Sequence, residues 1–482
     1  MWKFTPEQWE DLRIQARAEI VRRYAKEKNI LEWGKLLFPE KFPLPFCQEF
    51  HGYLVKVRKS PFSVLEAPRN HSKTTIQCFL IKIFQALEEP KEFRHYLSVQ
   101  KTESKALSIN TTIKTEIETN ELLRIVYGDM KGQGRWTDQQ FALKNGVAFS
   151  SIGAGQSVRG TNYLNIRPDY IDVDDLYDEE DINNIESTAK KNQWFWSSLF
   201  PCRAKSKNSS IHVQGTAINN EDILNQLKGK ERWISKTFQA IKDWKKKEVL
   251  WKELNTFDDL IQDRKDMGTV IFLRELQNER RSNSESIIKE KWLRYYNPKD
   301  LEFDDDFILE EVLLGCDPSI GKEKKGKSTS DFTGVALILK CRYADGEGYH
   351  YYIENVWNQR LSLHKRISLL SSIHKDQKEK RPISQANIEG ISGFQDFVSE
   401  VIRKTDIPVR QISHVKDKIT NLENKSHYFE NAKVFISEDI ETELRDMLVY
   451  QLTTNYPKND DIRDAVLLCI DENEGSGDVL FI

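Results

Sequence analysis

The chain has little of what marks secreted, membrane-spanning or generally basic proteins. Its six cysteines are scattered with no CxxC pair, so the sequence predicts neither a disulfide framework nor a zinc site. No apolar run approaches the roughly 18 residues that a membrane-spanning helix needs, and the first residues lack the apolar core of a signal peptide. Lysine and arginine number 72 against 75 acidic residues, so contact with a nucleic acid would depend on local basic patches.

What the chain has instead is length and an ordinary globular composition. Its 482 residues are 39% hydrophobic and 30% charged, which predicts a folded protein of two or three domains. The pattern changes along the chain, and we expect domains over 1–227 and 301–482. Residues 228–300 between them are rich in Lys, Glu, Trp and Asp, with a helical period and no convincing strand. This stretch is predicted to be a helical lid or linker.

Two stretches have the pattern of sheets. In the first, short apolar runs alternate with helical stretches, and the expected strands are 62–65, 96–99, 170–173 and 211–213. Such alternation predicts a parallel α/β sheet. In the second, three apolar runs follow one another without helical connections, at 309–314, 334–339 and 349–356. These predict an antiparallel meander, with more α/β alternation behind it.

The residues after the first predicted strand have the layout of a phosphate-binding loop. They read Ala67-Pro68-Arg69-Asn70-His71-Ser72-Lys73-Thr74-Thr75, and a predicted helix follows over 76–87. In such a loop, backbone N–H groups and the helix N-terminus hold phosphate, a lysine reaches the β- and γ-oxygens, and a threonine hydroxyl binds Mg²⁺. Ala67 and Ser72 stand where the motif has glycines, so the alternative is an ordinary basic strand–helix turn.

A second predicted strand ends in two adjacent acids, Asp174 and Asp175. In ATPases with phosphate-binding loops, the first such acid steadies Mg²⁺ and the second orients the attacking water. Asp172 interrupts the same strand and competes with Asp174 for the Mg²⁺ role. The next strand ends in Gly215-Thr216, whose polar end is suited to sense a γ-phosphate.

Carboxylates also end elements in the C-terminal half. Asp317 ends an apolar strand, Glu389 ends another, and Asp464 lies in an acidic cluster that opens an apolar helix. This order is the layout of RNase H-like nucleases. Two Mg²⁺ or Mn²⁺ ions about 4 Å apart need several carboxylates that converge on one edge of a sheet. We expect Asp317 to bridge the two ions, and Glu389 and Asp464 to bind one each.

Further acids flank this set. Asp460 and Asp461 lie about one helical turn or less from Asp464, so either is a candidate auxiliary ligand. Asp331, at the start of the next strand, is a candidate outer ligand. A single acid at a strand end is usually a solvated cap, but the order of the whole set favours a metal site.

Taken together, these motifs resemble the large subunit of tailed-phage terminases in order and spacing. The resemblance runs from about residue 40 to the end and fades across 228–300. It rests on the motifs at 67–75, 156–160, 167–175, 215–222, 317–318, 388–390 and 461–465. It implies an N-terminal P-loop ATPase of the RecA/ASCE type with a parallel sheet, followed by an RNase H-like nuclease with a mixed sheet.

The resemblance implies roles for further residues. Arg69 and Arg159 become candidate arginine fingers, with Arg159 acting on a neighbouring subunit. The alternative for each is a phosphate- or DNA-binding arginine. Gln48, with Phe46 and His51 nearby, lies where such ATPases hold adenine, and a helix–helix contact is the alternative.

The resemblance also implies cofactors and partners. The cofactors are ATP with Mg²⁺ and two Mg²⁺ or Mn²⁺ ions in the nuclease. The partners are double-stranded DNA, the portal protein, the terminase small subunit and further copies of the chain in a ring on the procapsid, with a monomer in free solution and no membrane. The implied location is the host-cell cytoplasm during assembly, not the virion. Lys418 either steadies the scissile phosphate or is a surface lysine.

Two other functions remain open from the sequence. A helicase–nuclease of DNA repair or defence shares the ATPase chemistry, but it needs a second RecA-like domain for which 228–300 offers no pattern. A DNA-binding assembly protein with a weakened ATPase is compatible with the missing loop glycines.

Overall fold

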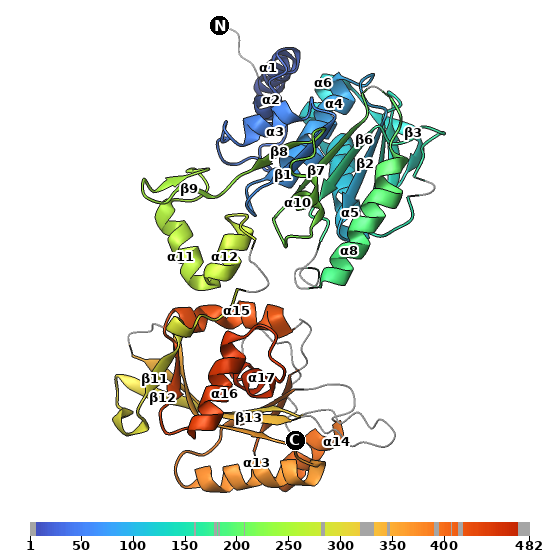
Figure 1. Cartoon of the computed structure of the whole chain (residues 1–482). Coiled ribbons are helices and arrows are strands. Elements are labelled where there is room, and N and C mark those ends of the chain that lie inside the picture. The colour runs from blue at the N-terminus through green and yellow to red at the C-terminus, as the bar shows by residue number, and fades with distance from the viewer. Residues whose placement is uncertain are drawn as a thin grey trace. The chain divides into compact units, whose positions relative to one another are not determined.

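The computed structural model describes residues 6–158, 161–177, 181, 184–206, 208–280, 285–318, 332–344, 348–389, 395–405, 407–412 and 418–470. The chain forms two compact units, and both are drawn in Figure 1. The first unit is Met1–Gln262 with Phe272–Arg281, and the second is Asp263–Ile271 with Ser282–Ile482. No helix in the described part is long and apolar enough to cross a membrane.

In its described residues, the first unit is built on an eight-stranded sheet in the order β3-β4-β5-β2-β6-β7-β1-β8. The strands are β1 (Phe62–Glu66), β2 (His95–Gln100), β3 (Lys131–Trp136), β4 (Gln140–Leu143), β5 (Ala148–Gly153), β6 (Tyr170–Asp174), β7 (Ser210–Gly215) and β8 (Ile234–Thr237). The pairs from β5 to β8 in this order are parallel, and β3, β4 and β5 pair antiparallel. The predicted parallel sheet is confirmed, with β1, β2, β6 and β7 as the four expected strands.

The central strands of this sheet are buried on both faces, and successive side chains of a strand point to opposite faces. In β2, Tyr96 packs into one hydrophobic cluster, while Leu97 and Val99 pack into another. The helical segments of this unit before residue 228 are α1 (Pro6–Lys26), α2 (Ile30–Leu37), α3 (His51–Val57), η1 (Thr75–Ile81), α4 (Lys82–Glu88), α5 (Glu103–Thr119), α6 (Glu121–Tyr127), α8 (Ile185–Trp194), η2 (Phe195–Leu199), α9 (Phe200–Cys202) and α10 (Ile223–Leu227). Core residues of α2–α6 and η1 join the Tyr96 cluster, and those of η2 and α10 join the other.

The second unit carries a mixed sheet in the order β11-β17-β14-β13-β12-β15-β16. Its strands are β11 (Arg294–Tyr296), β12 (Phe307–Asp317), β13 (Thr333–Tyr343), β14 (Tyr349–Gln359), β15 (Gln385–Glu389), β16 (Val409–Ile412) and β17 (Val434–Ser437). The antiparallel meander predicted from three apolar runs is confirmed as β12, β13 and β14. The remaining neighbours pair parallel.

Helices cover both faces of this second sheet. They are α13 (Leu363–Lys378), α14 (Gln395–Lys404), α15 (Lys418–Glu430), α16 (Thr442–Thr453) and α17 (Asp461–Leu467). Core residues of α13 and α14 share one cluster, and those of α15, α16 and α17 share another. Two glycines let α17 lie directly on the meander. A Cβ at Gly315 would fall 2.0 Å from the carbonyl oxygen of Ala465, and one at Gly334 would fall 2.1 Å from that of Asp461.

Residues 228–300 differ from expectation. The prediction that they contain no strand is wrong, because β8, β9 (Ile241–Asp243), β10 (Glu248–Val249) and β11 all lie there. The side chains of β8 are mostly exposed, so the strand shows no apolar run, and it forms by pairing with β1. The helical segments are α11 (Phe257–Met267), α12 (Thr269–Glu275), η3 (Glu290–Trp292) and η4 (Pro298–Asp300). The two units divide this stretch between them, and its role as a lid or linker stays a prediction.

Candidate nucleotide and nuclease sites

The predicted phosphate-binding loop joins β1 to a helix, as its sequence suggested. Ala67 donates its backbone N–H to Gly215 at the end of β7. Ser72 takes a φ of 61° and Asn70 a φ of 64°, in the left-handed region that glycine favours. Ser72 therefore has the backbone conformation of the glycine that the predicted motif has at this position, at a cost on the order of 1 kcal/mol.

Lys73 and Thr74 contact the acids at the end of β6. Thr74 Oγ1 donates to Asp174 Oδ2 at 2.8 Å. Lys73 Nζ lies 3.4 Å from Asp175 Oδ1 and donates to Thr216 Oγ1 at 3.3 Å. The structure thus brings together a lysine, two acids and two hydroxyls from the loop, β6 and the end of β7. This is the set that the sequence assigned to phosphate, Mg²⁺ and water.

Asp174 is a buried acid held by amide groups. Gln214 Nε2 donates to its Oδ1 at 2.8 Å, and Gln100 Nε2 donates to its Oδ2 at 3.1 Å. Burial and the nearby Asp175 raise the pKa of Asp174 to about 7. A carboxylate in this position gains from a cation, so its chemistry fits the Mg²⁺ of a nucleotide. The two glutamines were not predicted, because nothing in their local sequence marks them.

Asp172 has a different partner from Asp174. Its Oδ1 lies 2.9 Å from Lys82 Nζ, and both side chains are buried, at 1% and 0% exposure. Burial raises the pKa of Asp172, and Lys82 opposes that rise. Of the two acids that competed in the sequence, Asp174 is the one that bonds to Thr74.

Lys82→Met is expected to lower the free energy of unfolding of the first unit by about 3–5 kcal/mol, because Asp172 would stay buried without its cation. The double variant Lys82→Met/Asp172→Leu should recover most of this loss. Chemical denaturation measures both. Lys190→Met is a matched control, since Lys190 pairs with Glu186 at 72% and 79% exposure and should cost little. If Lys82→Met unfolds at the same denaturant concentration as the wild-type protein, the pair does not stabilise the fold.

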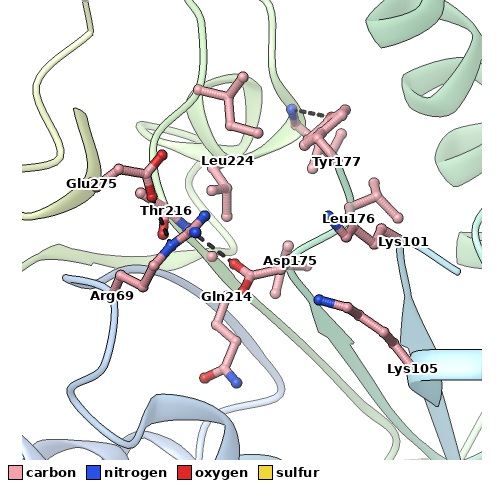
Figure 2. Close-up of a pocket in the computed structure, with 14 residues that line it drawn as sticks. Arg69, Lys101, Lys105, Asp175, Leu176, Tyr177, Gln214, Thr216, Leu224 and Glu275 are labelled. Carbon is pink, nitrogen blue, oxygen red and sulfur yellow. Dashed lines mark hydrogen bonds and ion pairs between the residues drawn. The ribbon is translucent and has the colours of Figure 1, made fainter. Parts of the chain in front are cut away.

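Arg69 lines a pocket of about 360 Å³ in the first unit, together with Asp175 (Figure 2). Its Nε lies 2.8 Å from Glu275 Oε2, and its backbone N–H donates to the Glu275 carbonyl at 2.9 Å. Lys101 and Lys105 also line the pocket. Three cationic side chains make this wall suited to an anion. Glu275 was not predicted, because it lies 206 positions after Arg69 in a stretch read as linker.

The sequence also predicts nucleotide contacts for Gln48 and Arg159. Gln48 lines a separate pocket of about 650 Å³, together with Phe46. His51 Nε2 lies 3.2 Å from the carbonyl oxygen of His71, so this segment packs against the loop. Contact of Gln48 with adenine stays a prediction. Arg159 lies outside the described residues.

In the second unit, two predicted acids lie side by side at one sheet edge. Asp317 ends β12 and Glu389 ends β15, and these strands are parallel neighbours that pair Cys316 with Ile388. Burial, and then the hydrogen bond and charge of Glu389, raise the pKa of Asp317 well above its usual range. The strand ends therefore bring the two carboxylates into contact, as the sequence predicted for a metal site.

The third acid, Asp464, lies on α17, and the ammonium of Lys418 lies between it and Asp317. Lys418 Nζ lies 2.5 Å from Asp464 Oδ2, 3.0 Å from Asp460 Oδ1 and 4.0 Å from Asp317 Oδ2. Burial lowers the pKa of Lys418, but these acids outweigh it and the net shift is upward. Lys418 is thus surrounded by acids at its ammonium end. Asp460, rather than Asp461, makes the contact beside Asp464.

The donor chemistry of this cluster fits a divalent cation. Carboxylate oxygens suit Mg²⁺ and Mn²⁺. Burial is the main cause of a raised pKa at both Asp464 and Asp461, and the pKa of Asp461 rises to about 6. A cation relieves such crowded negative charge. In the described part of the chain, no three His, Cys, Asp or Glu side chains already surround one point as a metal group would need. The ammonium of Lys418 lies among them instead. Asp331 lies outside the described residues.

Comparison with known proteins supports the fold. No family model matches the chain, and no curated protein matches it in sequence. The large terminase of a thermophilic bacteriophage, solved in complex with ADP, superposes with a TM-score of 0.51 at 11% identity, over 88% of this chain and 98% of that one. The HK97 bacteriophage large terminase gives a TM-score of 0.36 at 11% identity, over 87% and 93%. The human cytomegalovirus terminase nuclease domain gives 0.27 at 17% identity, over 38% and 92%. The first of these superpositions shows that the chain has the fold of a bacteriophage large terminase, with an α/β unit on a largely parallel sheet followed by an α/β unit on a mixed sheet.

Proposed function

We propose that this chain is a terminase large subunit, which moves viral double-stranded DNA into a procapsid by ATP hydrolysis and cuts concatemeric DNA with a metal-dependent nuclease. One observation carries the proposal. A chain with the fold of the thermophilic-phage terminase holds both a Lys73–Thr74–Asp174 cluster in its first unit and a convergent set of acids in its second. A motor needs the first cluster, and a nuclease needs the second.

In the first unit, the loop and Lys73 bind the phosphates of ATP, and Thr74 and Asp174 hold its Mg²⁺. The ion would neutralise charge on the β- and γ-oxygens. Asp175, next to Lys73 and Thr216, orients the attacking water. Arg69 at the pocket wall neutralises charge that develops on the γ-phosphoryl group, and Arg159 does so from a neighbouring subunit. The thermophilic-phage terminase was solved with ADP, which supports a nucleotide site in this fold.

In the second unit, Asp317, Glu389 and Asp464 hold two Mg²⁺ or Mn²⁺ ions, with Asp461 and Asp331 as auxiliary ligands. Such ions supply an activated water and stabilise the departing oxygen. Lys418, already among the acids, steadies the scissile phosphate. The proximity of Asp317 and Glu389 at adjacent strand ends supports their joint role as residues that would hold a metal ion.

The proposed partners follow from this role. They are double-stranded DNA, a portal protein, a terminase small subunit and further copies of the chain in a ring on the procapsid, with a monomer free in solution. The proposed location is the host-cell cytoplasm during assembly.

The proposal is tested by metal removal together with a fork assay. The full chain should cut plasmid DNA with Mn²⁺ or Mg²⁺, and a chelator should stop cutting within the assay because the acids lose their ions. With ATP it should leave a forked duplex unseparated. Cutting that continues in the chelator contradicts the nuclease site. ATP-dependent strand displacement would instead identify a helicase–nuclease.

A further inference from the structure

Arg463 is a fully buried cation in the middle of the nuclease acids. Its side chain is 1% exposed, and it lies in α17 one position before Asp464. Burying a guanidinium is costly unless its N–H groups find acceptors. Nη1 finds three backbone carbonyls near the C-terminal end of α16, those of Gln451, Thr454 and Asn455, at 3.3–3.5 Å. The guanidinium is therefore fixed by backbone that takes no part in metal binding.

The rest of the guanidinium contacts two acids. Nε donates to Asp464 Oδ1 at 3.2 Å, and Nη2 donates to Asp460 Oδ2 at 3.1 Å. The other oxygen of each acid faces Lys418, Asp464 Oδ2 at 2.5 Å and Asp460 Oδ1 at 3.0 Å. In each carboxylate, one oxygen thus contacts the buried guanidinium of Arg463 and the other faces the ammonium of Lys418.

The side chain of Asp460 does not cap α17, although Asp460 is the residue at its N-terminus. It is the N-cap residue of α17, where an aspartate usually accepts a backbone N–H from the first turn, but it makes no such bond. Gln451 Oε1 accepts the N–H groups of Ile462 and Arg463 instead, at 3.1 and 3.0 Å. The Asp460 carboxylate is therefore free to face Arg463 and Lys418.

We infer that Arg463 is a positioning residue of the nuclease site. By holding one oxygen of Asp460 and one of Asp464, it directs their other oxygens to the same cation position, where the Lys418 ammonium lies in this structure. The inference rests on the proposed nuclease function, and it gives Asp460, a candidate auxiliary ligand from the sequence, a defined place among the acids that face the proposed metal. Groups that orient metal ligands in this way typically change metal affinity by about 10–100-fold when they are replaced.

Calorimetric titration of the full chain with Mn²⁺ tests the inference without an activity assay. Arg463→Lys keeps the buried charge, but a single ammonium cannot reach two acids and three carbonyls at once. Mn²⁺ affinity should fall by about tenfold or more. Asp460→Asn leaves Arg463 in place and should also weaken binding. Arg403→Lys is the matched control, because Arg403 pairs with Glu400 at the same three-residue spacing but at 70% exposure. Its Mn²⁺ affinity should equal that of wild type.

A second measurement separates positioning from simple loss of stability. The rise in Tm that Mn²⁺ produces should be smaller in Arg463→Lys than in wild type. A residue with only a structural role would lower Tm equally with and without Mn²⁺ and leave the affinity unchanged, which overturns the inference. Wild-type affinity in Asp460→Asn overturns it as well, even where Arg463→Lys does not fold. If the wild-type chain binds no Mn²⁺, the proposed nuclease fails together with the inference, whereas the outcomes above overturn the inference alone.

Discussion

Asp317→Asn should abolish DNA cleavage, with a loss of about a thousandfold or more, while ATP turnover stays at the wild-type rate. The amide keeps the size of the side chain but removes the charge that would bridge two metal ions, which is worth several kcal/mol in the transition state. Asp317 lies at the end of β12 against Glu389 and 4.0 Å from the Lys418 ammonium, so its charge belongs to the set of acids that would hold the ions. Plasmid nicking with Mn²⁺ and phosphate release from ATP measure the two activities on one preparation.

Asp376→Asn is the control for this variant. Asp376 is an exposed acid on α13 of the same unit, and its replacement should change neither activity. Normal cleavage by Asp317→Asn would mean that the acids at the ends of β12 and β15 are not the nuclease site.

Lys73→Ala should have the converse effect, a loss of ATP hydrolysis of about a hundredfold or more with DNA cleavage retained. Lys73 is only 6% exposed, and its ammonium lies between the loop, Asp175 and Thr216. Alanine removes the charge that would contact the β- and γ-oxygens, so both nucleotide binding and transition-state stabilisation should suffer. Steady-state turnover with ATP and titration with a non-hydrolysable analogue measure the two effects.

Lys59→Ala, an exposed lysine shortly before β1, is the matched control and should hydrolyse ATP normally. Loss of both activities in Lys73→Ala, with a lowered Tm, would indicate global damage and not a nucleotide site. Undiminished hydrolysis would remove the loop from the mechanism.

Much of the fold follows from local pattern. The strands β1, β2, β6 and β7 are buried throughout and contain short apolar stretches, and the apolar runs of the β12–β14 meander have no helical connections. Strands at sheet edges were harder to predict, because pairing with a neighbour forms them and their side chains face solvent. β8 is the clear case, since three of its four residues are exposed and it lies beside β1.

The sites divide in the same way. The positions of Asp174, Asp317 and Glu389 at strand ends could be predicted from the sequence, because each follows a short apolar run, whereas their roles in a site stay predictions. Their supporting partners could not be predicted, because contacts between residues distant in sequence decide them. Asp172 pairs with the buried Lys82 while Asp174 accepts from Thr74, and no local pattern distinguishes the two acids. Nothing in the local sequence marks Arg463 as buried, yet its side chain is 1% exposed and packs against the end of α16.

The central claim is that one chain carries both a metal-dependent nuclease site and a separate nucleotide site. A crystal structure of the full chain soaked in Mn²⁺ tests it most directly. The account predicts anomalous density contacted by Asp317, Glu389 and Asp464, with the Lys418 ammonium displaced from its position 2.5 Å from Asp464. Manganese bound elsewhere, or none while Lys418 still holds Asp464 and Asp460, would contradict it.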